Sequence, residues 1–500
     1  MLTVVACLTL VTPALLVIPL DGRPVRFGVC LPAAAVASGL RLEGRGQLQW
    51  RRLPVGGTDA DPVWVELAIT GPRGTVRLCA GSGAPCANGS GPVVVREIEE
   101  QVLAEGRQRT VRWRWHDGTV DECTRVVFTQ PTVVAGESYA AGEARTTLTV
   151  GMRERSEVLC RLHRDVLAFA GVMPEPGGGG ATTRDLRAHL RTVLPLLHEL
   201  PGARGAGDYG RSGGVVTNLE FDTTLALLRC AFGLREPAAL ARALRSATHL
   251  LDRDFDPATG LLFPHGPDHR TGTPEPGHVW LQGLLFAALL TADDDGLLAV
   301  HNLARALATT PPMGEGASER LRDWAWPLLE LEAALVVMPD RVVARAADRL
   351  ATSIARRFDP VLRTFRFGEG EVGAGVYFER GWLLGGLLLP ALRAHLLRRP
   401  DAKLADHVAA ATAMLLERLG AGGQGLPTHW RAVGREVFAE HREQGTAEAA
   451  FLLEALEPSD LARVLRRASV RAAIAELPSP RDPDLATQLS LLARCTWVWR

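Results

Sequence analysis

Histidines gather in one short stretch of this chain. Three of its 13 histidines, His265, His269 and His278, lie in a segment rich in glycine and proline, with Asp268 and Arg270 beside the second of them. Such a loop offers little packing reason to hold histidine, and imidazole is the side chain best suited to moving protons near neutral pH. The stretch therefore favours saccharide binding or acid–base chemistry. A divalent metal site and a purely structural role stay open as alternatives, although this irregular spacing is weak evidence for a metal.

A second group of polar residues stands before a predicted helix. It contains Tyr209 and Arg211, followed by Asn218, Glu220 and Asp222. We expect Asn218 to be the N-cap of this helix, which places both carboxylates in the first turn. Capping and compensation of the helix dipole already explain such residue types at a helix start. A catalytic or substrate-binding role is the alternative.

Aromatic residues accompany charged residues at the next predicted helix starts. Indole rings suit stacking on the C–H faces of sugars, but they equally suit the packing of one helix on another. Tyrosine is scarce, with 3 in the whole chain, so that few phenol groups are available for proton transfer. The candidates of this kind are Trp280, Asp323, Trp324, Trp326, Tyr377 and Trp382.

The elements that must position these residues divide the chain into two parts. Up to about residue 150 the apolar residues alternate as in half-buried strands, and beyond residue 181 they recur with the helical period. The resulting fold class is an all-β N-terminal region followed by an all-α domain of six helix pairs, an (α/α)6 toroid. The predicted helices span 183–199, 217–233, 237–252, 279–293, 296–309, 319–337, 340–357, 380–396, 402–419, 446–456, 459–475 and 483–496.

The pattern of the β region predicts two units, at 15–82 and 90–160. A glycine-rich linker separates this region from the predicted helical domain at 181–500. Asp117-Gly118 between two alternating runs predicts a hairpin. The apolar residues 1–20 are either a signal peptide, which would make the protein exported or periplasmic, or the start of a first strand at 14–20 in a cytoplasmic protein. Cys79 and Cys86 flank a glycine-rich turn and could pair as a local disulfide.

Composition excludes several function classes. Lys+Arg and Asp+Glu are both 56, so the formal net charge is zero and nothing favours nucleic acid as a partner. No P-loop, dinucleotide-binding glycine motif or nucleophile-elbow motif is present, so no cofactor is expected. No stretch after the N-terminus is a credible membrane span. No prediction of oligomeric state follows from the sequence.

The motifs together resemble those of a known family. The runs 218–222, 264–269, 277–283 and 322–327 are similar to the toroid domain of exo-rhamnogalacturonan lyase-like proteins (the PcRGLX/YetA-like family). The run 22–32 resembles the opening of that family's N-terminal RIFT-barrel domain. The resemblance implies a RIFT barrel at 15–82, a reduced β-sandwich at 90–160 and a catalytic toroid. It also implies β-elimination on a uronate-containing, pectin-like saccharide.

β-Elimination at a uronate needs three groups. The substrate carboxylate must be neutralised, a base must take the C5 proton, and an acid must protonate the leaving oxygen. Arg211, Asn218 and Arg270 suit the first role. The base would be His269 or His278, and the acid Tyr209 or Tyr377. His265, Asp268, Asp222 and the tryptophans would bind the saccharide.

Two other functions stay open. The first is glycoside hydrolysis by paired carboxylates, for which Glu220, Asp222 and Asp323 are the candidates. The second is saccharide binding without catalysis. It is motivated by the short β region and by Gln282, which stands where the family pattern has glutamate.

Overall fold

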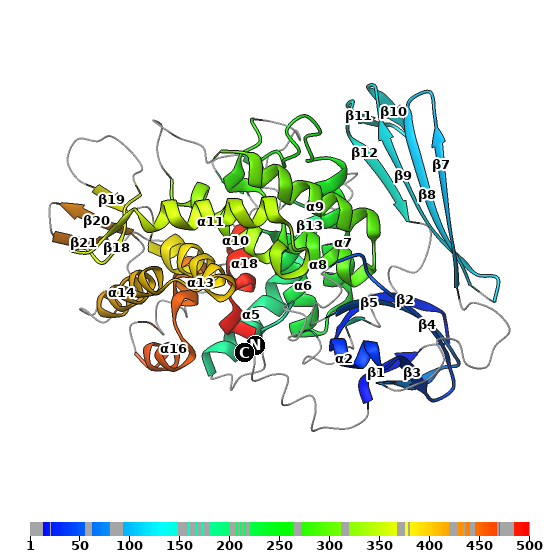
Figure 1. Cartoon of the computed structure of the whole chain (residues 1–500), viewed down its shortest axis with the longest axis horizontal. Coiled ribbons are helices and arrows are strands. Elements are labelled where there is room, and N and C mark those ends of the chain that lie inside the picture. Colours follow the sequence, from blue (N-terminus) through cyan, green and yellow to red (C-terminus); the bar gives the residue numbers. More distant parts are fainter. Residues whose placement is uncertain are drawn as a thin grey trace.

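The computed structural model describes residues 14–20, 22–55, 63–80, 94–115, 117–148, 159–160, 167, 172–174, 181–199, 207–208, 211–212, 215–216, 221–264, 272–311, 320–367, 376–378, 381–419, 429–433, 436–440, 446–467, 470 and 485–499. In this part of the chain, strands come first and helices follow (Figure 1). The strands β1 to β12 lie at one side of the molecule, and the helices from α5 onward form the larger body beside them.

Six strands form two three-stranded antiparallel sheets, ordered β1–β6–β3 and β2–β5–β4. The alternative in which residues 14–20 form a first strand is confirmed, because β1 pairs with β6. Strand β2 is buried along its whole length. A Cβ at its Gly28 would overlap the carbonyl of Leu289 in helix α8, so sheet and helix meet without a gap. The elements are β1 (Ala14–Leu20), β2 (Val25–Leu31), α2 (Ala33–Ala37), β3 (Leu40–Glu43), β4 (Gln47–Arg52), β5 (Val63–Thr70) and β6 (Gly74–Ala80).

The next strands form a four-stranded antiparallel sheet, ordered β12–β9–β8–β7, and a separate hairpin, β10–β11. The predicted hairpin at Asp117-Gly118 is confirmed, since it joins β8 to β9 and Gly118 has a φ of 86°. Cys79 is buried in β6, and Cys86 lies outside the described residues. The division into a RIFT barrel and a β-sandwich stays a prediction. The strands are β7 (Val94–Val102), β8 (Gly106–Trp115), β9 (Val120–Phe128), β10 (Thr132–Val134), β11 (Glu137–Tyr139) and β12 (Ala144–Leu148).

Helices dominate the rest of the chain, and each of the predicted helical segments corresponds to a helix. One of them contains a π-helical turn at Leu384–Leu388, between α12 and α13. The helices are α5 (Ala181–Val193), α6 (Thr223–Leu234), α7 (Pro237–Asp252), α8 (Gln282–Thr291), α9 (Asp294–Thr309), α10 (Arg322–Val337), α11 (Arg341–Ala355), α12 (Gly381–Leu383), α13 (Leu389–Arg398), α14 (Ala402–Arg418), α15 (Thr446–Leu452), α16 (Pro458–Leu465), α18 (Leu485–Arg494) and α19 (Thr496–Trp499).

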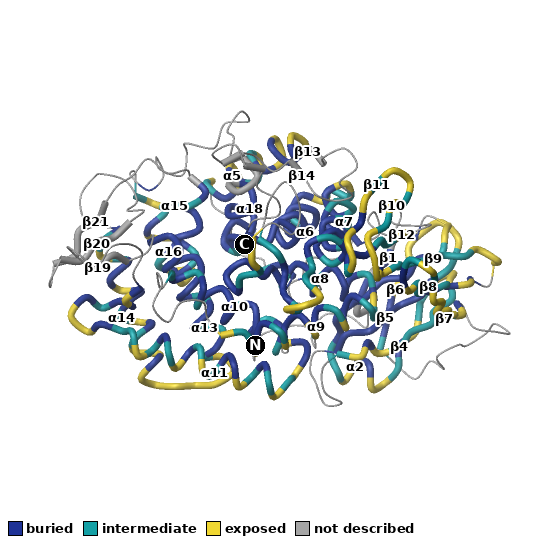
Figure 2. The backbone as a smooth tube through the Cα atoms, turned by 90° about the horizontal axis from the view of Figure 1, so that it is seen from above, coloured by how far each residue is buried: buried dark blue, intermediate teal, exposed yellow. Residues whose placement is uncertain are grey.

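The helices close into a ring. Helix α6 packs on α8, α8 on α10, α10 on α13, the α12–α13 segment on α15, and α15 on α18. The ring closes because α18 also packs on α6, and α5 packs against α18 and α19 to complete the sixth pair. The inner helices are mostly buried, whereas α11 and α14 carry exposed residues on their outer side (Figure 2). The chain therefore folds as a β region followed by an (α/α)6 toroid, as expected.

One helix start differs from the prediction. Helix α6 begins at Thr223, and its N-cap is Asp222, whose Oδ1 accepts a hydrogen bond from the Leu225 N–H at 3.0 Å. The expectation that Asn218 caps this helix is therefore wrong. Phe221 and Asp222 both have φ values near the left-handed region, 54° and 55°, so helical geometry cannot extend back through them.

Among the described residues, no helix combines the length and apolar character that crossing a lipid bilayer requires.

Candidate functional site

The two ends of the toroid differ in the length of their connections. Five inner helices pass to their outer partners through short turns, at 235–236, 292–293, 338–340, 399–401 and 456–457, whereas the sixth, α18, packs on α5 from the start of the helical region. Much longer segments lead to the next inner helix, at 197–222, 253–281, 310–321, 356–380, 419–445 and 466–484. In a ring of antiparallel helix pairs, connections of one kind lie at the same end. We call the end with the long connections the mouth.

The residues predicted to form a site all belong to these long connections or to the first two turns of inner helices. Two of them, Arg211 in strand β15 (Arg211–Ser212) and Tyr377 in strand β19 (Val376–Phe378), are described by their backbone; Tyr377 pairs with Arg431 of strand β20 (His429–Val433). The site as a whole stays a prediction, because its other loop members lie outside the described residues: Tyr209, Asn218, Glu220, His265, Asp268, His269 and Arg270.

The described part of the mouth holds a charged network around His278. This side chain is 7% exposed, and its Nδ1 lies 3.1 Å from Oε2 of Glu275. Its Nε2 lies 2.5 Å from Nη2 of Arg322, the first residue of α10. A guanidinium can only donate, so Nε2 must be the unprotonated nitrogen and the ring proton is on Nδ1, facing Glu275. In the tautomer that this contact requires, the unprotonated ring nitrogen of His278 faces a cation.

Arg320 joins the carboxylates of this network. It donates to Oδ2 of Asp323 at 2.8 Å and to Oε2 of Glu275 at 3.0 Å. The contact with His278 and then that with Arg320 lower the pKa of Glu275 to about 2, so Glu275 is ionised at neutral pH. Burial raises the pKa of Asp323, and Arg320 opposes this shift. A Cβ at Gly277 would overlap Oδ1 of Asp323, which explains the glycine before His278.

Three of the four tryptophans expected to bind saccharide are core residues instead. Trp280, Trp326 and Trp382 are 3%, 1% and 2% exposed, and all three pack around Phe221. The indole Nε1 of Trp326 donates to the carbonyl of Val279 at 2.7 Å. Their packing accounts for these three rings in the core, and the role in saccharide binding stays a prediction for them. The packing of the inner helices around Phe221 requires large aromatic rings, and sugar binding would require the same residue type.

Trp324 differs from the other three. It is partly exposed, and the guanidinium of Arg357 lies 4.5 Å from the centre of its ring. This arrangement is a cation–π contact at the rim of the toroid. Of the predicted tryptophans, Trp324 is therefore the one with ring surface that solvent can reach, and its role in saccharide binding stays a prediction.

Asp222 and Glu330 form a second, fully buried acidic pair at the start of α8. Oδ2 of Asp222 accepts from the Gly283 N–H at 2.9 Å, and Oε2 of Glu330 accepts from the N–H groups of Leu281 and Gln282 at 3.0 and 2.8 Å. These carboxylates satisfy the orphan donors of the helix N-terminus. Asp222 therefore has a structural role at two helix starts, and its contact with substrate stays a prediction.

The two carboxylates compete for protons. Burial, and then the neighbouring charge of Asp222, raises the pKa of Glu330 to about 8; burial also raises the pKa of Asp222. Nη1 of Arg494 lies 3.9 Å from Oδ2 of Asp222, and its guanidinium stacks over Trp326. Sequence reasoning missed Glu275, Arg320, Glu330 and Arg494, because Glu330 and Arg494 lie in distant helices and Arg320 reaches Glu275 from another connection.

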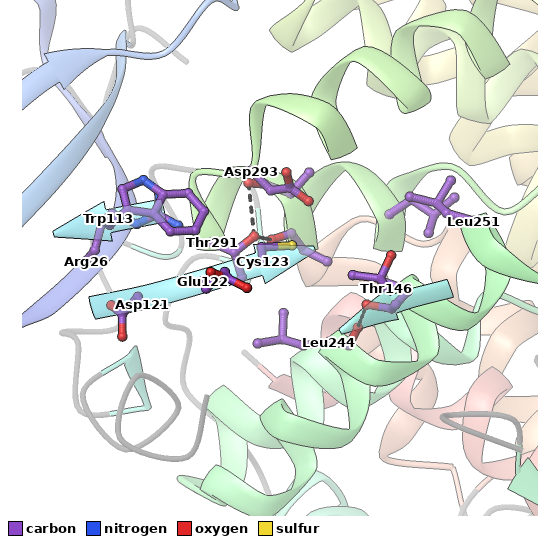
Figure 3. Close-up of a pocket in the computed structure, with 15 residues that line it drawn as sticks. Arg26, Trp113, Asp121, Glu122, Cys123, Thr146, Leu244, Leu251, Thr291 and Asp293 are labelled. Atoms are coloured by element: carbon purple, nitrogen blue, oxygen red, sulfur yellow. Dashed lines mark hydrogen bonds between the residues drawn. The ribbon is translucent and has the colours of Figure 1, made fainter. Parts of the chain in front are cut away.

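A small cavity lies between the four-stranded sheet and helices α7 and α8 (Figure 3). Its volume is about 100 Å³, and Arg26, Trp113, Glu122, Cys123 and Asp293 are among the residues that line it. That volume has room for a few water molecules and is below the roughly 300 Å³ of a typical ligand pocket. Burial raises the pKa of the Cys123 thiol to about 12, which makes it unreactive. We therefore interpret the cavity as a packing gap between the sheet and the helices rather than as a ligand-binding site.

No cluster of three or more histidine, cysteine, aspartate or glutamate side chains arranged to hold a metal ion occurs in the described part of the chain. The metal alternative rested on His265 and His269 together with His278, and the first two lie outside the described residues, so it is not tested.

The chain matches no protein-family model, and no curated protein sequence matches it significantly. Among solved structures it is similar to a cellobiose 2-epimerase from Bacillus thermoamylovorans B4167, at 13% identity and a TM-score of 0.40, over 62% of this chain and 98% of that one. It is also similar to a family 76 glycoside hydrolase from a bovine Bacteroides thetaiotaomicron strain, at 9% identity and a TM-score of 0.43, over 95% and 97% of the two chains. Likenesses this distant assign neither a family nor an activity.

Proposed function

We propose that this chain is a carbohydrate-active enzyme that cleaves a uronate-containing saccharide by β-elimination at the mouth of its toroid. The observation that carries the proposal is the contact between Nε2 of His278 and Arg322. A base and a cation side by side match what β-elimination needs, since the proton removed lies on the carbon next to the substrate carboxylate. The sequence resemblance to rhamnogalacturonan lyase-like proteins supports the same reaction.

The contacts suggest an order of events. The substrate carboxylate binds the guanidinium of Arg322 and draws it away from His278, which exposes Nε2 to the C5 proton. His278 takes that proton, the C5–H electron pair forms the C4–C5 double bond, and the C4–O4 bond breaks. Glu275 stabilises the resulting imidazolium through Nδ1. Tyr209 or Tyr377 would then protonate the leaving oxygen.

The direct test is incubation of the purified protein with rhamnogalacturonan and a panel of polyuronates, with ultraviolet absorbance of the unsaturated product as the readout. Removal of a positioned base costs about 10²- to 10⁴-fold in rate, so His278→Asn should reduce kcat by that order. Arg322→Gln should lower kcat as well, because it leaves the substrate charge uncompensated. His301→Asn is the matched control. His301 also contacts a carboxylate, Oδ2 of Asp340, at 3.0 Å, but Asp340 lies in a short connection at the opposite end.

Absence of unsaturated product across the whole panel would refute the lyase proposal. New reducing ends without absorbance would select hydrolysis instead. Two of the three carboxylates considered for hydrolysis, Asp222 and Asp323, are 1% exposed and bound to backbone N–H groups or to Arg320. This occupancy favours elimination over hydrolysis. Saccharide binding without any new ends would select the non-catalytic alternative.

A further inference from the structure

A groove of about 410 Å³ lies beside the charged network of the mouth. Its walls come from the C-terminal end of α9, the first turns of α10 and the second half of α11. The volume falls within the roughly 300 to 1,000 Å³ range of small-molecule sites. The residues that matter for its chemistry are Pro276, Thr309, Thr310, Trp324, Arg349 and Ser353.

The groove is continuous with the proposed catalytic network. Pro276 lies between Glu275 and the glycine before His278, and Asp323, which also lines the groove, accepts from Arg320. Because Pro276 and Asp323 border both the groove and the network, the groove is the neighbouring cavity that the next unit of a saccharide held at His278 would enter.

The groove offers the groups that a sugar needs. The hydroxyl of Thr309 donates to the Arg305 carbonyl at 3.0 Å, and that of Thr310 donates to the Ala306 carbonyl at 2.9 Å. Because both hydroxyl protons are used, these oxygens can serve a ligand only as acceptors, and sugar hydroxyls are donors of matching kind.

Two further groups in the groove point to a ligand with acceptors and negative charge. Within the described part of the chain, the indole Nε1 of Trp324 is a buried donor that has no hydrogen-bond partner, a state that a bound acceptor would relieve. Arg349 is exposed on α11, and its guanidinium donates to the Ala308 carbonyl at 3.4 Å. A guanidinium binds carboxylates with paired, charge-assisted hydrogen bonds.

We propose that the groove is a subsite for an acidic sugar unit next to the one held at His278, with Arg349 binding its carboxylate and Trp324 Nε1 donating to a ring or hydroxyl oxygen. This inference rests on the proposed function for the position of the reacting sugar. It adds that the enzyme prefers chains in which successive or alternate units carry a carboxylate.

Calorimetric titration with galacturonate oligomers of increasing length tests the subsite without requiring turnover. In the wild-type protein, affinity should rise when the chain becomes long enough to reach the groove. In Arg349→Met that gain should fall by about tenfold, the loss expected for one charge-assisted contact. Trp324→Phe should reduce the gain as well, because it keeps the ring under Arg357 and removes the donor. Arg345→Met is the matched control, since Arg345 is exposed one turn earlier on α11 and does not line the groove.

If the affinities of Arg349→Met and Arg345→Met rise equally with oligomer length, the subsite proposal is overturned. An affinity that does not rise with chain length in the wild-type protein would overturn it as well. Failure of the lyase proposal has a different signature, because unsaturated product would be absent while the length-dependent binding and its loss in Arg349→Met persist. Thermal unfolding of each variant separates a lost contact from a lost fold.

Discussion

Replacement of Glu330 by glutamine probes the buried acidic pair at the start of α8. Glu330 is 0% exposed, and burial raises its pKa from 4.5 to about 8. Asp222 at the start of α6 and Arg494 of α18 are the charged groups that act on it most. In the unfolded chain this carboxyl ionises near its ordinary value. Between about pH 4.5 and 8 the folded state therefore holds a proton that the unfolded state has lost.

The sign of the pH dependence follows from this difference. Where the folded state binds more protons, the free energy of unfolding falls as pH rises. One pKa unit corresponds to about 1.4 kcal/mol, so a shift of this size predicts a fall of a few kcal/mol between about pH 5 and 8. Glutamine cannot ionise, and its oxygen can still accept from the N–H groups of Leu281 and Gln282. Glu330→Gln should match the wild type near pH 5 and become progressively more stable than it by pH 8.

The assay is urea unfolding followed by circular dichroism at several pH values. Glu332→Gln is the matched control, because Glu332 is also buried on α10 but is paired with Arg398 and His395. Burial alone would raise the pKa of Glu332, but the hydrogen bonds from Arg398 and His395 lower it below its ordinary value. Removal of one partner of such a pair typically costs about 3 to 5 kcal/mol, so this variant should be less stable than the wild type throughout. A stability difference between Glu330→Gln and wild type that does not grow with pH would refute the reasoning.

Two further predictions concern the same end of the toroid. Gly283→Ala should lower the free energy of unfolding by about 1 to 3 kcal/mol, because the new Cβ would overlap Oδ1 of Asp222 and the start of α8 would have to shift. Chemical unfolding measures this loss, and an unchanged unfolding midpoint would contradict the close approach. The pKa of Glu275 is lowered to about 2, so its ionised carboxylate stabilises the fold at neutral pH and this stabilisation is lost between about pH 4.5 and 2. Glu275→Gln should therefore be less stable than the wild type at neutral pH and should lose less stability on acidification. Acid titration followed by tryptophan fluorescence checks it, and identical curves for variant and wild type would count against the pairing with His278.

The helical half of the fold could be predicted because its signal is local. The segment 237–252 has the apolar period of a helix and ends at charged residues, and α7 has the same bounds. The strand at 14–20 and the hairpin at Asp117-Gly118 were equally readable from alternation and turn residues. The start of α6 was not, because a distant partner, the N–H of Gly283, makes Asp222 rather than Asn218 the better cap.

The candidate site was predictable only as a set of segments. The sequence located polar loops before the inner helices, and a closed ring places those connections at one end whatever their sequence. It also identified His278 and Trp324, whose neighbours in the chain include glycine, proline and charge. It could not rank four tryptophans of similar surroundings, because the burial of Trp326 or Trp382 depends on Phe221 and on helices far away in the chain.

By itself, then, the sequence determined the order and type of the elements, since helical and strand periods are properties of neighbouring residues. The tertiary structure alone decided which carboxylates are structural and which belong to the mouth. Asp222 and Glu330 differ from Glu275 in the groups that surround them rather than in residue type. Burial against α8 raises the pKa of the first two, and contact with His278 and Arg320 lowers that of the third. Glu275 and His278 lie three residues apart in one long connection, whereas Arg320 comes from the next long connection, and the packing of the ring brings it to them.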